Sequence, residues 1–96
     1  MPEIQEISKI LADLSSADEV EKFLYEVLTD NERKDLSLRW ELMKKLYAGV
    51  PQRSIASELG ISLCKITRGS KILKSEDSVT GRILASLAES GDLKNG

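Results

Sequence analysis

The chain has 96 residues, of which 41% are hydrophobic, 31% charged and 4% aromatic, and its formal net charge is −2. This balance excludes a disordered chain, which would be less apolar, and a membrane-spanning chain, which needs about 18 consecutive apolar residues. Because there is one cysteine and no histidine, an internal disulfide, a Cys/His zinc site and a Cys-His or Ser-His catalytic pair are also excluded.

Two helices are predicted at the amino-terminal end. Apolar residues at helical spacing predict the first helix from about residue 3 to 14. The serines at 15–16 can cap a second helix, which ends near Leu28. Thr29 and Glu32 then have the spacing of a capping box, so a third helix begins there. The start MPEIQEISK lacks the basic and apolar segments of a signal peptide, and we expect a cytoplasmic protein.

The third predicted helix is the longest, at about 19 residues, and Gly49 is its natural C′ residue. We expect Trp40 in a core or a dimer interface rather than in a binding site. The apolar stripe of this helix, with the two leucines beside it, consists of Leu36, Trp40, Met43, Tyr47, Leu42 and Leu46.

Three shorter helices are predicted after it. Pro51 fits the first turn of a fourth helix that runs to Leu59 and is terminated by Gly60, and Ser62 can cap a fifth that extends to about Lys74. A sixth begins at Ser75 or Ser78, although Gly81 within it costs roughly 1 kcal/mol relative to alanine.

The predicted fold is therefore all-α, with six helices. No stretch alternates β-branched and aromatic residues between turn signals, so no sheet is expected. We expect residues 1–90 to form a single helical domain and residues 91–96 to form a disordered tail.

Residues 52–69, QRSIASELGISLCKITRG, have the pattern of a helix-turn-helix. Ala56 is small enough for a steep crossing of two helices, Gly60 permits a left-handed turn, and Ile66 returns an apolar contact from the second helix. An ordinary helical hairpin in a bundle core is the alternative. Because several positions agree at once, we interpret residues 51–74 as a reading head for DNA.

Charge is distributed unevenly along the chain. Residues 1–32 carry a net −7 and residues 33–74 a net +7, and the stretch 52–74 alone carries +4. A basic centre between acidic ends suits an anionic partner that meets one face, although solvated helix faces would give the same counts.

A helix-turn-helix inserts the N-terminal end of its second helix into the major groove. With Ile66 toward the core, Lys65 can donate to guanine O6 and N7, and Leu63 can contact a thymine methyl group. Arg53 and Lys74 would bind phosphates. The residues at the groove-facing end are Ser62, Leu63, Cys64, Lys65 and Thr67.

The segments LTDNERKDLSLRWELMKKLYAG and QRSIASELGISLCKITRGSKILK resemble the Trp repressor family, over about residues 24–74. The most specific pieces are the LT-x-x-ER start of the long helix and the run ITRGS. The resemblance implies an interlaced, six-helix homodimer that binds a palindromic operator in double-stranded DNA. It also implies L-tryptophan as corepressor and genes of tryptophan biosynthesis or transport as targets.

The same resemblance implies a ligand site. The indole ring would lie between Arg39 and Arg68, with Leu28 and Thr29 of the partner subunit at the ring edge and the carboxylate. An alternative reading of the two arginines is that they are surface or ion-paired residues. The positions that match the family's ligand site are Leu28, Thr29, Arg39, Met43, Arg68, Gly69 and Ile72.

The chain departs from the family pattern at a few positions. The connection before Gln52, which opens the reading head together with Arg53, is one residue shorter. Ile72 replaces a small residue near the ligand's amino group, and Ala56 replaces a base. Lys71 replaces an asparagine and lies near the expected phosphate path.

Alternative functions follow from the same residues. The chain could be a helix-turn-helix regulator that responds to a different small molecule or to none, or an adaptor whose helix-turn-helix binds protein. An enzyme is the least favoured class, because acidic pairs such as Glu76-Asp77 sit at a predicted helix start, and no catalytic residue, metal ligand or other cofactor is expected.

Overall fold

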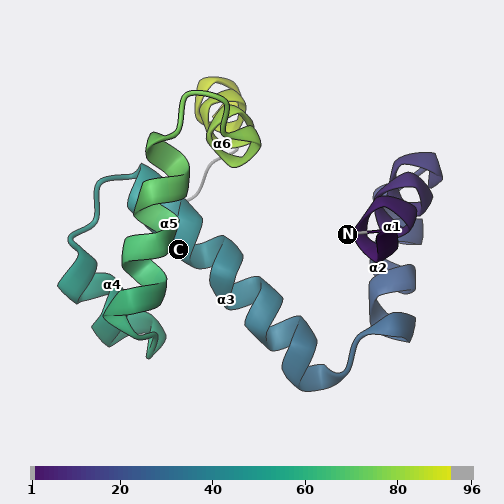
Figure 1. The fold of residues 1–96 in the computed structure, drawn as a ribbon, viewed down its shortest axis with the longest axis horizontal. Helices are drawn as coiled ribbons and strands as arrows, with labels where there is room; N and C mark the ends of the chain where they lie inside the picture. Colours follow the sequence, from purple (N-terminus) through teal and green to yellow (C-terminus); the bar gives the residue numbers. More distant parts are fainter. Residues whose placement is uncertain (1, 92–96) are drawn as a thin grey trace. The chain divides into compact units, whose positions relative to one another are not determined.

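The computed structural model describes residues 2–91, with side chains from Ile4 onward, and within this range it is built from α-helices alone (Figure 1). The predicted all-α fold with six helices is confirmed. Only Gly91 of the predicted tail is described, and the rest of that tail lies outside the described residues. The helices are α1 (Pro2–Asp13), α2 (Ala17–Val27), α3 (Asp30–Tyr47), α4 (Gln52–Leu59), α5 (Leu63–Lys74) and α6 (Val79–Ser90).

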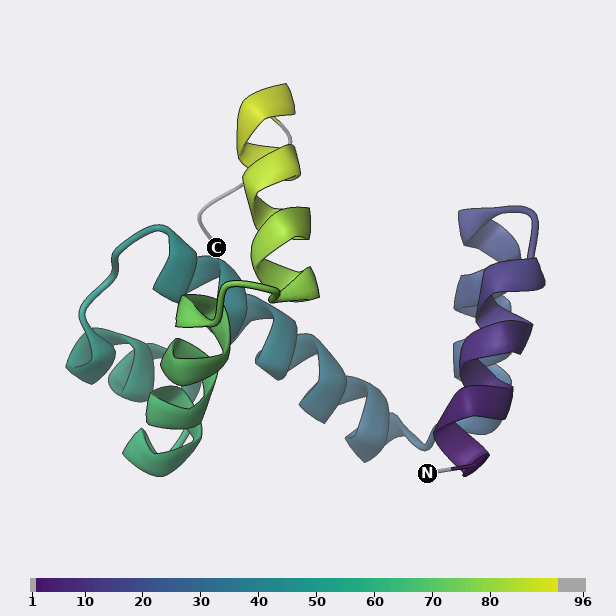
Figure 2. The ribbon, with the colours of Figure 1, turned by 45° about the horizontal axis from the view of Figure 1, so that its top comes forward.

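The chain divides into two compact units, residues 1–35 and 36–96, whose boundary falls within α3. In the first unit α1 and α2 lie side by side (Figure 2). Their apolar residues are only half-buried, and Ile4, Ile7 and Ile10 of α1 stay exposed. The half-buried residues are Leu11, Leu14, Val20, Phe23 and Leu24.

The turn between α1 and α2 is held by the two serines that precede α2. The hydroxyl of Ser16 accepts a hydrogen bond from the Glu19 backbone N–H at 3.2 Å, as an N-cap residue does. The Glu19 carboxylate in turn accepts from the Ser15 hydroxyl at 2.5 Å and the Ser15 backbone N–H at 3.1 Å. Both hydrogen bonds favour the charged form of the carboxylate and so lower the pKa of Glu19. The hydrogen bond from the Ser15 hydroxyl has the larger effect.

The core of the second unit forms where α3, α4 and α5 meet. Ile55 of α4 and Ile66 of α5 are fully buried at 0% exposure, and Leu42 of α3 is exposed to 4%. The prediction that Ile66 faces the core is therefore confirmed. The half-buried residues packed around these three are Leu46, Val50, Ala56, Leu59 and Ile61.

The turn between α4 and α5 has the predicted chemistry. Gly60 adopts the left-handed conformation, with φ at 65°, and its N–H donates to the Ala56 carbonyl oxygen at 2.9 Å. Ser62 then caps α5 by accepting from the Lys65 backbone N–H at 3.4 Å. Together these residues allow α5 to fold back against α4 as in a helix-turn-helix.

Two helix boundaries differ from or refine the sequence prediction. Pro51 was expected in the first turn of α4, but its ψ of 142° is extended, and the helix begins one residue later at Gln52. Ser78, not Ser75, caps α6, because its hydroxyl accepts from the Gly81 N–H at 2.9 Å. Gly81 therefore lies in the first turn, where the cap and not the helix interior sets its environment.

The apolar stripe expected on α3 does not form the core of the single chain. Leu36, Trp40 and Tyr47 are 49%, 37% and 41% exposed. Because α4 and α5 cover the adjacent face of α3, the buried positions are Leu42 and Lys45. The expectation that Trp40 lies in a core or a dimer interface therefore stays a prediction for the dimer, whereas the buried Lys45 is not part of the apolar pattern.

No helix within residues 2–91 combines the length and the apolar character required to cross a membrane.

We predict that Ile55→Ala destabilises the protein by about 2–5 kcal/mol, because it leaves a cavity where the side chain is fully enclosed. Urea denaturation followed by circular dichroism, at one protein concentration, measures the loss. Ser57→Ala, at an exposed position of the same helix, is the control and should change stability by less than about 0.5 kcal/mol. Equal stability of the two variants would contradict the core described above.

Candidate nucleic-acid interface and ligand site

The N-terminal half of α5 presents one buried and several exposed side chains. Because Ile66 is fully buried, helical periodicity turns its neighbours outward. The exposed residues are those predicted at the groove-facing end, namely Ser62, which caps the helix, and Leu63, Cys64, Lys65 and Thr67, which were predicted to be available to bases. Leu63, at 51% exposure, places a large apolar side chain in water at the helix end, and Cys64 is a free thiol. The end of α5 is thus open to a partner.

Polar and basic side chains lie exposed at the start of α4 and at the far end of α5. Gln52 and Arg53 lie exposed in the first turn of α4, and Lys71 and Lys74 lie exposed in the last turn of α5. The two lysines also complement the negative C-terminal end of the helix dipole, which is an ordinary structural reason for their presence. Arg53 and Lys74, which were predicted to bind phosphates, and Lys71, which was predicted near the phosphate path, are nevertheless all exposed on the two helices of the reading head.

The proposed ligand residues of α5 and α3 include one close contact between the helices. Gly69 is buried, and a Cβ atom placed there would lie 3.1 Å from Leu46 Cδ1, 3.5 Å from Leu42 Cδ2 and 3.6 Å from Met43 Sδ. The absence of a side chain therefore lets α5 approach α3. This packing requirement alone explains the glycine, and it brings Gly69 and Met43 together.

The two arginines of the predicted sandwich are both exposed. Arg39 lies one helical turn before Met43 on α3, and Arg68 directly precedes Gly69 on α5. Ile72, 37% exposed, lies one turn after Arg68 and so shares its face of the helix. Each arginine is thus adjacent, along its own helix, to a residue of the α3–α5 contact.

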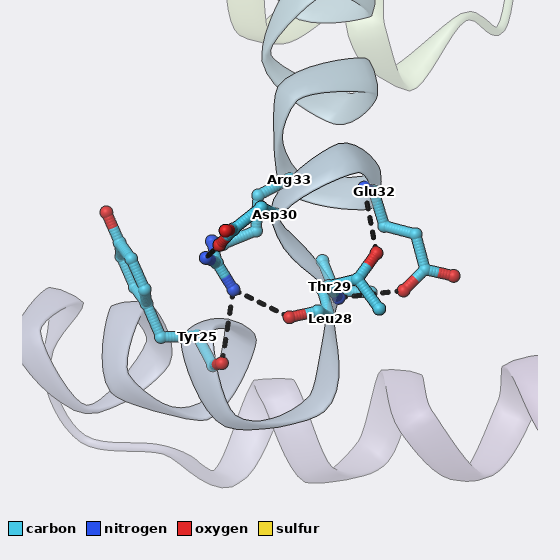
Figure 3. A network of polar contacts seen from close by, with 6 residues as sticks. All are labelled: Tyr25, Leu28, Thr29, Asp30, Glu32 and Arg33. Carbon is cyan, nitrogen blue, oxygen red and sulfur yellow. Dashed lines mark hydrogen bonds and ion pairs between the residues drawn. The ribbon is translucent and has the colours of Figure 1, made fainter.

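Leu28 and Thr29, the other predicted ligand residues, belong to the first unit and form the junction between α2 and α3 (Figure 3). The Thr29 N–H donates to Glu32 Oε1 at 2.8 Å, and the Glu32 N–H donates to Thr29 Oγ1 at 3.2 Å. These reciprocal bonds are the predicted capping box, which is confirmed.

Arg33 holds the same junction from the side of α3, a role that the sequence pattern did not predict. Its Nη1 donates to the backbone carbonyl oxygens of Tyr25 at 3.2 Å and Leu28 at 2.6 Å (Figure 3). The guanidinium also pairs with Asp30 and lies 4.2 Å from the centroid of the Tyr25 ring. Arg33 therefore satisfies carbonyl groups that the end of α2 leaves without helical partners. In the sequence, the feature that could have indicated this role is the Glu32-Arg33 pair of the LT-x-x-ER motif.

Residues 2–88 match the family described as "Trp repressor protein". The chain belongs to the Trp repressor family. The match extends beyond residues 24–74, which carry the sequence resemblance, and includes α1, α2 and most of α6. Trp repressors are regulatory DNA-binding proteins rather than enzymes, so this chain is a transcriptional repressor with a helix-turn-helix formed by α4 and α5.

Curated relatives carry the name "Trp operon repressor homolog". The one from Chlamydia trachomatis serovar L2 is 41% identical over 69 residues, which cover 67% of this chain and 73% of the relative. The one from Vibrio campbellii is 32% identical over 88 residues, covering 91% and 88%. The one from Xylella fastidiosa strain M23 is 39% identical over 67 residues, covering 69% and 73%. No solved structure gives a significant match.

Within the part of the chain that the structure describes, no group of three histidine, cysteine, aspartate or glutamate residues is placed to hold a metal ion.

We predict that Arg33→Lys loosens the junction between α2 and α3. Lysine keeps the charge but cannot bind both carbonyls while stacking on Tyr25. A loss of about 1 kcal/mol would speed hydrogen exchange at the Leu28 and Thr29 amides roughly fivefold. Lys34→Arg, which conserves charge at the adjacent exposed position, is the control. Unchanged exchange in both variants would show that Arg33 does not hold the junction.

Proposed function

We propose that the chain acts as a homodimer that binds a palindromic operator and represses genes of tryptophan biosynthesis or transport, with L-tryptophan as corepressor. In this proposal residues 1–90 form one functional domain and residues 51–74 are its reading head. The observation that carries it is the buried Ile66 on a helix whose remaining N-terminal side chains are exposed, in a chain of this family. Operator DNA and free tryptophan meet in the cytoplasm, which is the proposed place of action.

The proposed DNA contacts divide into two classes. Lys65 donates to a guanine edge and Leu63 contacts a thymine methyl group, while the other residues at the start of α5, Ser62, Cys64 and Thr67, line the groove. Backbone phosphates are bound by Gln52, Arg53, Lys71 and Lys74.

The homodimer is supported by apolar side chains that one chain leaves exposed. A monomer of this size buries only about 60% of its unfolded surface, so a second copy is the natural cover for such residues. Two heads of a dimer would then meet successive major grooves about 34 Å apart. The exposed apolar residues of α1, α3 and α6 are Ile4, Ile7, Ile10, Leu36, Trp40, Tyr47, Val79 and Ile83.

The proposed tryptophan site uses the two arginines. Their planar guanidinium groups stack on the faces of the indole, worth about 1–2 kcal/mol when desolvated, and Arg39 also pairs with the carboxylate. Leu28 and Thr29 come from the partner subunit, and Met43, Gly69 and Ile72 line the slot. Tryptophan would act as a corepressor only if it bound the DNA-competent arrangement of the heads more tightly than the other arrangements.

Ile72 favours a second candidate function. An apolar side chain, 37% exposed on the same face as Arg68, is a poor neighbour for the ammonium group of an amino acid. A helix-turn-helix repressor that responds to another small molecule, or to none, would keep the same DNA contacts.

Titration of a labelled palindromic operator with and without L-tryptophan, at fixed salt, tests the proposal. We expect operator binding to tighten at least tenfold with tryptophan, which corresponds to about 1.4 kcal/mol of coupling. Arg68→Glu should abolish this response, because it reverses the charge that stacks on the indole. Equal binding in both wild-type titrations would leave the reading head in place and refute the tryptophan slot.

Salt dependence separates DNA contacts from protein contacts. We expect Lys74→Ala to weaken operator binding evenly across sequences and to lower the slope of log K against log salt by about 1. Lys65→Ala should cost about 1–3 kcal/mol and relax the preference at one base pair. Binding to a protein partner that changes little with salt, without operator binding, would instead indicate an adaptor.

A further inference from the structure

Lys45 is the one charged residue that is buried among those whose side chains the structure describes, with 8% exposure. It belongs to α3, and its Nζ lies 2.8 Å from Oε2 of Glu58 on α4. Removing an ammonium group from water is costly unless a partner compensates it, so the pair depends on the two helices being placed correctly. The ion pair therefore reports a specific position of α4 on α3.

The pair is not required to fill the core. Replacing a buried ion pair by apolar side chains of similar size is often neutral or stabilising. The Glu58 side chain is 51% exposed and can return to water if its partner is removed. A methionine at position 45 would thus fit beside Leu42 and Leu46 without leaving a buried charge behind. The ion pair therefore contributes to the orientation of α4 on α3 rather than to the filling of the core.

The Lys45 side chain joins α3 to the last turn of α4, because its ammonium group pairs with Glu58 there. The Lys45 carbonyl oxygen accepts from the Val50 N–H at 3.0 Å, but this backbone bond ends α3 and does not depend on the side chain. The second helix of the reading head meets α3 separately, through the apolar contact of Gly69 with Leu46. An apolar contact alone tolerates sliding and rotation, whereas the ion pair favours one position of the last turn of α4 on α3.

We propose that Lys45 is a positioning residue, whose ion pair with Glu58 sets the angle of the reading head on α3 and so prepares it for the operator. This inference rests on the proposed function of residues 51–74 in DNA binding. Neither Lys45 nor Glu58 contacts DNA in the proposal, and both act through the orientation of α4 and the α5 packed against it.

The adjacent lysine supplies a matched control. Lys44 pairs with Glu41 at 2.6 Å, one turn away on the same helix, so its ion pair joins no second element. Lys44→Met and Lys45→Met remove the same charge from neighbouring positions. Any general electrostatic effect on DNA binding is therefore common to both variants.

The test measures operator affinity and urea stability for Lys44→Met, Lys45→Met, Glu58→Gln and the Lys45→Met/Glu58→Gln double variant, at one salt concentration. We expect Lys45→Met to bind the operator about tenfold more weakly than Lys44→Met while remaining at least as stable as that control. Glu58→Gln should also weaken binding, and the double variant should be no weaker than the weaker single variant.

Glu58→Gln gives the sharpest discrimination. General electrostatics predicts that removing an acidic group strengthens DNA binding, whereas loss of positioning predicts that it weakens binding. Strengthened binding by Glu58→Gln, equal binding by the two lysine variants, or additive losses in the double variant would each overturn the proposal. Parallel loss of affinity and stability in Lys45→Met would do the same, because it would indicate a general structural role.

A readout without DNA separates this inference from the proposed function. Residual dipolar couplings of backbone N–H groups report the orientation of α4 relative to the C-terminal part of α3. We expect them to change in Lys45→Met and not in Lys44→Met. If the wild-type protein bound no operator, the proposed function would fail, but the couplings would still test the role of Lys45. Unchanged couplings in Lys45→Met would refute that role.

Discussion

The apolar contact of Ile55 and Ile66 with Leu42 is the interaction on which the second unit depends. It joins α4, α5 and α3 through three almost fully buried side chains, in a chain too short to have a large core. Because Ile66 is held inward, the other N-terminal side chains of α5 must face solvent. The same contact that stabilises the helices thus makes a surface available for DNA.

Other contacts around this apolar centre set the orientation of the helices relative to one another. Gly60 and Ser62 set the turn between α4 and α5, Gly69 lets α5 approach α3, and Lys45 ties α4 to α3 through Glu58. Each of these features depends on specific atoms and so favours one orientation of the helices. The hydrophobic effect, which has no direction, determines only which helix faces are covered. A repressor needs both, since base recognition depends on the orientation of the helix that enters the groove.

Much of the fold and part of the candidate site could be predicted from sequence. The capping box of Thr29 and Glu32 and the left-handed Gly60 follow from local chemistry, and the family follows from LT-x-x-ER and ITRGS. The buried Lys45 did not follow. Periodicity shows that a helix has an apolar face, but it does not show which neighbour covers that face or whether a lysine stem lies under it.

By itself, the sequence determined the helices, their caps, the turn of the reading head and the basic character of its surface, because each depends on residues within a few positions of one another. Only the tertiary structure decided that Arg33 binds the carbonyl groups of Tyr25 and Leu28, and that Lys45 pairs with Glu58. These contacts join different helices, and the distance between such groups is set by how the helices pack, which no local pattern encodes.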